Sequence, residues 1–252
     1  MPDFSSWAAS ASALDVDVLA VQEVDNLLER SGRVDQVAEL RATLAQSGQA
    51  WTARFAAAVQ GTPGSRGTMR PAESTMREEP SYGVALLSRY PVTEWRELRM
   101  GPSPWARLPV PLPPTAPQRI LWVPDEQRVA VAGLIATPGG VVSAVCTHLS
   151  FAPSRAVVQL RQVATWARSL PRPLVLLGDL NLPGRLPRLI TGWEPLVKAA
   201  TYPVPRPRMQ LDHVLLDAGK ARLHLETAEA RIVGKSDHLA LRVELAMGRN
   251  GP

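Results

Sequence analysis

The sequence predicts a mixed α/β domain whose strands pair in a mixed or antiparallel manner. Many short apolar runs are bounded by turn residues, as is typical of strands, while a few segments have the apolar spacing of a helix. The hairpin signal Pro138-Gly139-Gly140 joins two apolar runs directly, which a strict βαβ repeat would not do. Because no internal repeat or convincing boundary interrupts the chain, we expect one domain over residues 1–246 and a disordered tail over 247–252.

Helices are predicted where apolar residues recur every three or four positions. The predicted helices span residues 5–14, 33–47 and 154–170, with one further helical turn inside the loop 182–209. Gly48 is expected to end the second helix, and Ser154 is a candidate N-cap of the third.

Strands are predicted from continuous or alternating apolar runs. The predicted strands span residues 18–21, 51–59, 84–87, 129–137, 141–147, 174–177, 211–216, 222–233 and 239–245. Residues 60–80 are rich in Gly, Pro, Ser and charge, and residues 101–118 are rich in proline. Both segments are therefore predicted to be flexible loops without regular structure.

Composition limits the classes of function. The formal net charge of +5 favours anionic partners, which include nucleic acid, phosphorylated metabolites and acidic lipid headgroups, although the charge could also serve only to solvate the chain. The single cysteine, Cys146, excludes an intrachain disulfide and a cysteine zinc site, and we expect it to be an inert core thiol. We see no run long enough to span a bilayer and no secretory signal, so we expect a cytoplasmic protein.

Polar side chains stand at one end of several predicted strands. These residues are Glu23, His148, Asp179 with Asn181, Asp212 with His213, and Asp237 with His238. Rigid strands can deliver such groups to one rim, and carboxylates that converge there repel one another unless a cation lies between them. Mg²⁺ prefers oxygen ligands of this kind, and a neighbouring histidine can move protons near neutral pH.

Each of these residues also has an ordinary structural interpretation. Glu23 could be a solvated strand-end acid, Asp179 could begin an Asx turn, and His148 could be a hydrogen-bonded structural imidazole. His213 and His224 lie within strand patterns and are interpreted as structural. Spacing alone does not show that the strand ends meet.

Six motifs in chain order resemble the endonuclease/exonuclease/phosphatase superfamily, which includes pancreatic-type deoxyribonucleases, abasic-site endonucleases, neutral sphingomyelinases and inositol phosphatases. The motifs are QEVD, YGVALLSRYP, THLS, LLGDLN, LDHVLL and SDHLAL, and the resemblance covers about residues 14–246. It implies a four-layered α/β sandwich, in which two mixed, largely antiparallel sheets pack face to face with helices outside. It also implies a monomeric, Mg²⁺- or Mn²⁺-dependent phosphoester hydrolase.

The resemblance assigns roles around the metal and the attacking water. Glu23 matches the principal metal-binding glutamate, and Asp237 matches a further acid close to the metal. Asp179 matches the acid that orients or deprotonates water, and Asn181 matches the amide that binds a phosphate oxygen. Tyr82 could line the pocket but is interpreted as a packing residue.

The resemblance also assigns groups to the phosphate. His238 matches the histidine that contacts the scissile phosphate, Asp212 matches its acidic partner, and His148 matches a second phosphate-contacting histidine. Arg128, at a strand start, and Arg89, in a turn-like SRYP sequence, are further candidate phosphate contacts. In-line attack needs an activated water, neutralisation of the phosphate oxygens and help for the leaving oxygen, and these residue types can supply all three.

One departure from the family pattern concerns the beginning of the chain. Family members begin with a strand that ends in an asparagine of the metal site, whereas the first residues here read as a helix. We expect that this strand is absent, either because the start was assigned too far downstream, which we favour, or because the chain is a shortened variant. Its loss would expose the edges of neighbouring strands and remove one ligand.

The resemblance leaves the substrate open. Loop arginines would suit a phosphate backbone: Arg66, Arg70, Arg185, Arg188, Arg206 and Arg208. The stretch TYPVPRPRMQLDHVLL looks more like the small bacterial members that are similar to sphingomyelinase-like and GPI-anchor-remodelling proteins. We therefore expect a lipid or small-molecule phosphodiesterase ahead of a DNA endonuclease or exonuclease. A non-catalytic module that binds anions or nucleic acid is the alternative from another class.

Overall fold

The computed structural model describes residues 4–65, 67–73, 78–103, 107–111, 118–221 and 223–247. Its helices are α1 (Phe4–Ser12), α2 (Gln36–Ala45), α3 (Pro153–Ala167) and α4 (Leu186–Thr191), with a short 3₁₀ turn at Glu29–Ser31. They match the predicted helical segments. Within the described ranges, none of the helices has the length and apolar character needed to cross a membrane.

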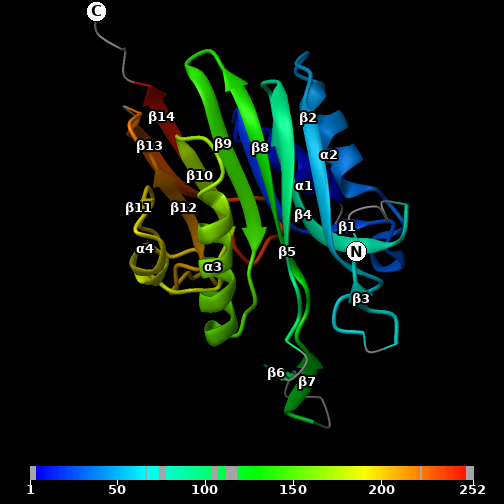
Figure 1. Ribbon diagram of the computed structural model, residues 1–252. Coiled ribbons are helices and arrows are strands. Elements are labelled where there is room, and N and C mark those ends of the chain that lie inside the picture. Colours follow the sequence, from blue (N-terminus) through cyan, green and yellow to red (C-terminus); the bar gives the residue numbers. More distant parts are fainter. Residues whose placement is uncertain are drawn as a thin grey trace, which may run out of the picture.

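The strands form two main sheets and two separate ribbons (Figure 1). The first sheet has the order β1 (Val18–Asn26), β4 (Ser81–Ser88), β2 (Thr52–Gln60), β3 (Arg70–Pro71). The second has the order β11 (Glu194–Pro195), β12 (Asp212–Asp217), β10 (Leu174–Asp179), β9 (Gly140–His148), β8 (Arg128–Thr137), β5 (Val92–Met100). The ribbons pair β6 (Arg107–Pro111) with β7 (Ile120–Pro124), and β13 (Leu223–Ile232) with β14 (Leu239–Met247).

The two main sheets pack face to face between layers of helices. Val84 and Leu86 of β4 share one buried cluster with Val131 of β8 and Cys146 of β9, so this cluster is the core between the sheets. A second cluster joins α1 and α2 to the outer face of the first sheet, and a third joins α3 to the outer face of the second. The four-layered arrangement with largely antiparallel pairing is the one expected, and the β9–β10 pair is parallel.

Three local predictions need correction. Residues 101–118 are not wholly irregular, because Arg107–Pro111 forms β6; its prolines are tolerated since a two-stranded ribbon has two free edges. Residues 60–80 likewise contain the short strand β3. Ala152, not Ser154, precedes α3 and gives no side-chain cap, and Pro153 occupies the first turn.

Other sequence expectations have a different outcome. The strand β5 was not predicted, because its sequence VTEWRELRM is charged and only partly buried. Within the described residues, β1 pairs only with β4, and β14 pairs only with β13. That a family strand is missing before β1 stays a prediction. Residues 248–252 of the expected tail and Arg66 lie outside the described residues.

The topology brings several strand ends to one edge of the second sheet, which we call the site end. Because β9 and β10 are parallel, His148 and Asp179 end side by side, and the antiparallel strand β12 begins there with Asp212. The β6–β7 ribbon leaves the body between the end of β5 and the start of β8, also at the site end (Figure 1). Gly178 permits this close pairing, because a Cβ at its φ of 155° would lie 1.9 Å from the carbonyl oxygen of Thr147.

Candidate active site

A row of polar side chains crosses three adjacent strands at the site end. Asp179 of β10 is the register partner of both His148 in β9 and Asp212 in β12. The His148 Nε2 atom lies 3.6 Å from Asp179 Oδ2. His148 and Asp179 are buried and Asp212 is half-buried. The rigid sheet therefore fixes an imidazole and two carboxylates next to one another.

His238 joins this row from the loop that precedes β14. Its Nδ1 atom lies 2.8 Å from Asp212 Oδ2. Ligand atoms of Asp179, Asp212 and His238 all lie within 4.8 Å of one another. The ring of Tyr202 packs on the imidazole of His238, with 4.7 Å between the ring centroids. Sequence reasoning missed this contact, since an aromatic residue in a proline-rich loop gives no signal of its partner.

Asn181 follows Asp179 in a strained turn. Its φ is 50°, in the left-handed region, and its backbone N–H donates to Asp179 Oδ1 at 2.8 Å. Its side-chain amide donates to the carbonyl oxygen of Leu149 at 3.0 Å. The Asx-turn interpretation of Asp179 is thus confirmed as local structure, and the same turn holds Asn181 at the rim of the row.

Glu23 reaches the site through an irregularity in β1. The register of β1 with β4 shifts between Val21 and Val24, and Glu23 has a left-handed φ of 58°. Bulges with such strained residues commonly re-aim a side chain beside a functional site. Glu23 is exposed, but its charge acts on Tyr82 and on Asp179.

Salt-bridged residues of β1 and the turn after it support this region. The Arg30 guanidinium donates to both oxygens of the buried Asp25 carboxylate, at 2.9 and 2.6 Å, and lies over the ring of Tyr82. Burial, followed by the charge of Glu23, raises the pKa of the Tyr82 hydroxyl, which therefore stays protonated. Tyr82 is a buried residue that packs beside Glu23, as expected.

The titratable groups of the row differ in charge. Burial and then the neighbouring charge of Asp212 raise the pKa of Asp179 to about 7. Burial opposes protonation of His238, but the hydrogen bond and charge of Asp212 outweigh it and raise the pKa of His238 to about 9. Burial and then the charge of Arg128 lower the pKa of His148 well below its usual range. At neutral pH the site thus holds a cationic His238 and a neutral His148.

Arg128 stands at the back of this site. It is buried and its Nη2 atom lies 3.6 Å from Glu126. Its Nε atom and the Nδ1 atom of His148 are buried without a hydrogen-bond partner among the described residues. Buried polar atoms without a partner are costly, so such atoms commonly bind a ligand or a water molecule. Arg128 is therefore retained as a candidate phosphate contact.

Other predicted residues lie outside the row. Arg89 is at the opposite end of β4 from Tyr82 and pairs with Asp15 at 2.8 Å and with Asp17, so we do not retain it as a phosphate contact. Asp237 is exposed, and its backbone oxygen accepts from Val204 N. Its charge still acts on its neighbour His238.

The remaining histidines and the cysteine have no part in the site. His213 Nε2 is 2.8 Å from the Leu182 carbonyl oxygen in a buried setting, and the exposed His224 lies 3.2 Å from Glu226. Cys146 is fully buried, and burial raises the pKa of its thiol to about 12, so it is the inert core thiol that was expected.

The donor set fits a hard divalent cation. Asp179 and Asp212 offer oxygen ligands close together, and after burial, the main cause of the raised pKa of Asp179, the charges of Asp212 and Glu23 also act against its ionisation. A cation bound among these carboxylates would relieve that repulsion. The residues whose ligand atoms lie close enough to share an ion are Asp179, Asp212 and His238, and Glu23 acts on Asp179 through its charge.

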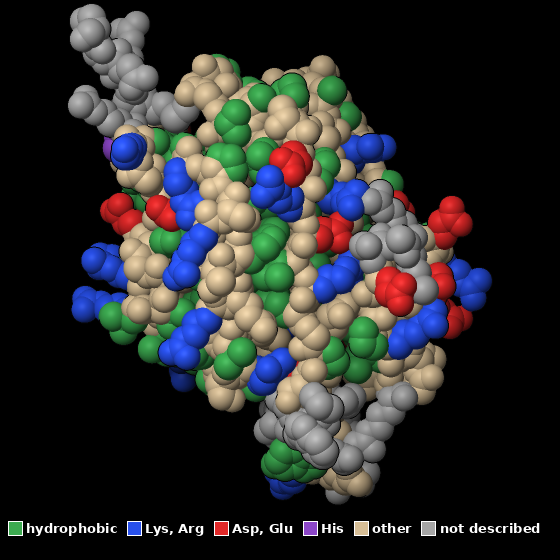
Figure 2. Space-filling view, in the orientation of Figure 1, with side chains coloured by type: hydrophobic (Ala, Val, Ile, Leu, Met, Phe, Trp, Pro, Cys, Tyr) green, Lys and Arg blue, Asp and Glu red, His purple; other side chains and the backbone are tan. Residues whose placement is uncertain are grey.

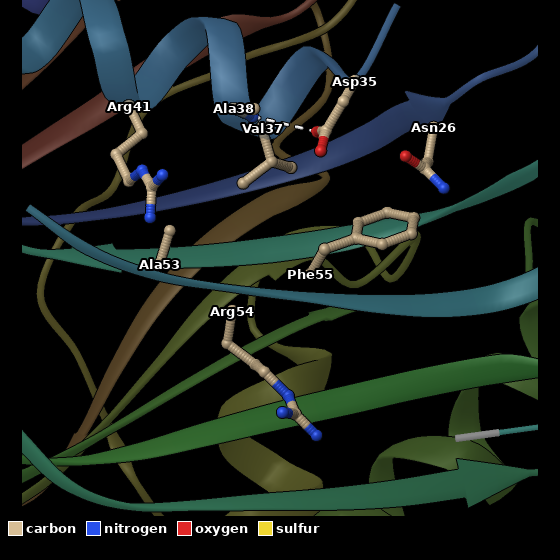
Figure 3. A pocket seen from close by; sticks show the side chains of 8 residues that line it. All are labelled: Asn26, Asp35, Val37, Ala38, Arg41, Ala53, Arg54 and Phe55. Carbon is tan, nitrogen blue, oxygen red and sulfur yellow. Dashed lines mark hydrogen bonds between the residues drawn. The ribbon is translucent and has the colours of Figure 1, made fainter. Parts of the chain in front are cut away.

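A concavity elsewhere on the molecule lacks this chemistry (Figure 3). It lies between α2 and the strands β1 and β2, and it is lined by Asn26, Asp35, Val37, Ala38, Arg41, Ala53, Arg54 and Phe55. Asp35 is occupied as the cap of α2, accepting from Ala38 N at 2.9 Å, and Arg54 pairs with Glu97. These polar groups serve the fold, so the row at the site end remains the candidate active site.

The fold and the row together define a class of protein: a two-sheet α/β sandwich with carboxylates and histidines gathered at one sheet end. Residues 3–238 match the model of the Endonuclease/Exonuclease/phosphatase family. The chain therefore belongs to this family of phosphoesterases, which includes phosphatases and nucleases. No curated protein matches the sequence.

Solved structures support the same fold. An endonuclease/exonuclease/phosphatase from Beutenbergia cavernae is similar with a TM-score of 0.66 and 21% identity over 98% of this chain, which spans 66% of that protein. A family protein from Leptotrichia buccalis gives a TM-score of 0.65 at 14% identity, covering 96% of this chain and 92% of the other. The mannosyl-6-phosphatase Bt3783 of Bacteroides thetaiotaomicron gives 0.59 at 13% identity, covering 96% and 90%.

Proposed function

We propose that the chain is a metal-dependent phosphodiesterase that hydrolyses its substrate by direct attack of water. The observation that carries this proposal is the row of His148, Asp179 and Asp212 with His238. It combines an acid that titrates near neutral pH with a cationic imidazole within hydrogen-bonding reach of a second acid. Family membership supports the reaction class.

Asp179 is the proposed base. A base is most effective when its pKa lies near the working pH, and the pKa of Asp179 is about 7 in the metal-free protein. The backbone N–H of Asn181 donates to Oδ1. Oδ2, which accepts from the Asn181 side-chain amide at 3.4 Å, would orient and deprotonate a water once that amide turns to the phosphate. The Asn181 amide, which donates to Leu149 O here, would turn to a phosphate oxygen when substrate binds.

His238 and Asp212 act as a pair toward the phosphate. The Asp212 carboxylate faces Nδ1, so it orients the ring and holds the proton, and Nε2 is left to donate to a phosphate oxygen. The Tyr202 ring, which packs against the imidazole in a tilted arrangement, would restrict its rotation. His148 and Arg128 lie at the other side of Asp179, where the Nδ1 and Nε atoms could meet the leaving group or a non-bridging oxygen.

A divalent cation, Mg²⁺ or Mn²⁺, is the proposed cofactor. Glu23 and Asp212 would hold it, with the nearby Asp237 as a further acid, and Asp179 would be left to act on the water. When bound, it supplies charge neutralisation on the phosphate oxygens and on the leaving oxygen. This charge would also lower the pKa of Asp179 and so keep the base ionised at neutral pH.

Hydrolysis of bis-p-nitrophenyl phosphate tests the proposal. We expect turnover that needs Mg²⁺ or Mn²⁺, that EDTA abolishes, and that Asp179→Asn removes. Asp217→Asn is a matched control, because this acid lies on β12 as Asp212 does but at the opposite end. Metal-independent turnover, or full activity of Asp179→Asn, would contradict the mechanism.

A substrate panel distinguishes the remaining alternatives. A lipid or small-molecule phosphodiester is the proposed class, and sphingomyelin, inositol phosphates, plasmid DNA and an abasic oligonucleotide are assayed together. Preferred cleavage of DNA would favour an endonuclease or exonuclease. Preferred hydrolysis of p-nitrophenyl phosphate would favour a phosphatase, the activity named for the similar Bacteroides protein. Salt-sensitive binding without turnover would favour a non-catalytic module.

A further inference from the structure

Four segments at the site end carry positive charge and contain no acidic residue, while the loop before β14 adds Asp237 beside Lys235. The described parts of these four segments form what we call the site rim: 101–103, 107–111 and 118–124, then 149–154, 180–193 and 198–211. Their sequences contain no Asp and no Glu, and they contain the basic residues Arg107, Arg119, Arg185, Arg188, Lys198, Arg206 and Arg208. Acids and bases are mixed elsewhere, as in the segment 61–80. All formally charged side chains of these four segments are therefore basic.

The same rim carries exposed apolar side chains. The large hydrophobic residues that are exposed in the described part of the rim are Ile120, Trp122, Phe151, Leu186, Leu189 and Met209. Leu189 is 75% exposed, and Trp122 is 50% exposed. Single exposed hydrophobic residues are ordinary, but a group of them on loops around one site marks an interaction surface.

The β6–β7 ribbon presents its apolar residues from a fixed base. Ile120 and Trp122 are two residues apart in β7 and so point to the same face of the ribbon. At its base, Asp125 accepts from Ser103 N at 2.7 Å and from Arg155 Nε at 3.0 Å. The ribbon projects beyond the body (Figure 1), and both hydrophobic and basic side chains are visible on its described part in Figure 2.

The helix α4 presents a second apolar group beside arginines. Leu186 and Leu189 are three positions apart and both face outward, whereas Pro187 is buried. Arg188 lies between them in sequence and is also exposed. In Figure 2, Lys and Arg side chains are spread over the flank that carries α3 and α4. Ribbon and helix thus repeat one pattern of aliphatic or aromatic residues among arginines.

We propose that the site rim docks the chain on an anionic lipid bilayer, so that the site faces phosphodiester headgroups. Arginines are attracted to an anionic surface, while Trp, Leu and Ile enter the boundary between headgroups and acyl chains. A nucleic-acid backbone would engage the arginines but would give Leu189 and Ile120 no apolar surface to enter. The biological sense of this docking rests on the proposed function, although binding itself does not require turnover.

Sedimentation of the whole chain with vesicles tests the docking. We expect binding to phosphatidylcholine vesicles that contain phosphatidylserine, weaker binding to pure phosphatidylcholine, and weakening by salt. Trp122→Ala combined with Leu189→Ala should weaken partitioning about tenfold, which corresponds to about 1.4 kcal/mol. The matched control, Leu225→Ala with Ile232→Ala, removes exposed apolar residues of β13 outside the rim and should leave binding unchanged.

A charge comparison completes the test. Arg188→Gln with Arg208→Gln should weaken binding to anionic vesicles several-fold, whereas Arg41→Gln with Arg168→Gln, exposed arginines outside the rim, should have little effect. All of these variants should keep their thermal stability and their turnover of bis-p-nitrophenyl phosphate.

Two outcomes would overturn the docking. The first is absence of vesicle binding at low salt in a chain that turns over the soluble ester. The second is duplex-DNA binding that follows Arg188 and Arg208, with vesicle binding that ignores Trp122 and Leu189. Vesicle binding by a chain without any turnover would support docking while removing the proposed function, so the two proposals can fail separately.

Discussion

The two ends of the second sheet treat charged side chains differently. At the end away from the site, Asp217 receives the Arg172 guanidinium at 2.7 Å, an ordinary ion pair. At the site end of the neighbouring strand, Asp179 faces Asp212 across the register, and its closest imidazole, His148, is held neutral. The far-end ion pair stabilises the fold, whereas at the site end the carboxyl of Asp179 lies between a second carboxylate and a neutral imidazole.

The same contrast appears in the backbone. Positive φ falls on glycine at both ends of the second sheet, as at Gly140 and Gly219 and at Gly178. The site additionally holds Glu23 and Asn181 at positive φ, a conformation that is unfavourable for Glu and tolerated by Asn. Proteins retain such residues where the function of the side chain outweighs the stability that the unfavourable backbone conformation costs. The comparison shows that the site can be located from its repelling carboxyl groups and its unfavourable backbone conformations.

The largest expected effect is on turnover. Asp179→Asn removes the proposed base, and we expect kcat to fall about a thousandfold with Mg²⁺ present. The far-end variant Asp217→Asn should keep kcat within about twofold, since it breaks only a partly exposed ion pair. Steady-state kinetics with bis-p-nitrophenyl phosphate measures both. Equal losses in the two variants would mean that the contrast between the ends concerns stability rather than catalysis.

The second prediction concerns the pair of Asp212 and His238. Asp212→Asn removes the charge that outweighs burial, so the pKa of His238 should fall from about 9 to below its usual value. Activity above neutral pH should then fall about a hundredfold, with a smaller loss at acid pH. NMR titration of the imidazole in the metal-free protein gives the pKa directly. An unchanged titration would remove Asp212 as the group that keeps His238 cationic.

The third prediction concerns stability without metal. The folded state binds the Asp179 proton more tightly, with a pKa of about 7 against 3.8, so ionisation destabilises the fold as pH rises through that window. Asp179→Asn lacks this penalty. We expect it to raise the free energy of unfolding by about 2 kcal/mol at about pH 8, with the gain vanishing below the unfolded pKa. Urea unfolding in EDTA at several pH values measures it, and a gain independent of pH would refute this cause.

Much of the fold could be predicted because it rests on local patterns. Apolar runs such as LVLL and amphipathic spacing in α3 identify strands and helices without knowledge of their partners. The strand β5 could not be found this way, since as an edge strand it is charged and its pairing with β8 is decided by tertiary structure. The β6–β7 ribbon was not predicted for a related reason, because strand pairing within a projecting hairpin tolerates proline.

The sequence allowed residues of the candidate site to be proposed, but it did not show their contacts. The strand-end pattern identified His148, Asp179 and Asp212, and the parallel β9–β10 pair then brings them together. The strand-end pattern could not exclude Arg89 in favour of Arg128, because both arginines adjoin strand ends. Only the fold shows that Arg89 lies away from the site and forms an ion pair with Asp15. Tyr202 was missed because its role depends on stacking against a residue distant in sequence.

The smallest expected effect is on stability, and it distinguishes a strained residue of the proposed metal site from a strained residue elsewhere. Glu23→Gly and Arg33→Gly both replace a side chain at positive φ, 58° and 60°, and each should raise the free energy of unfolding by about 0.5–1 kcal/mol. Arg33 is an exposed turn residue away from the row, so its variant should keep full activity. Glu23→Gly should gain stability in EDTA yet lose most of the stabilisation that added Mg²⁺ gives the parent chain. Thermal unfolding with and without Mg²⁺ measures this, and equal metal stabilisation in both variants would show that the strained conformation of Glu23 serves no metal site.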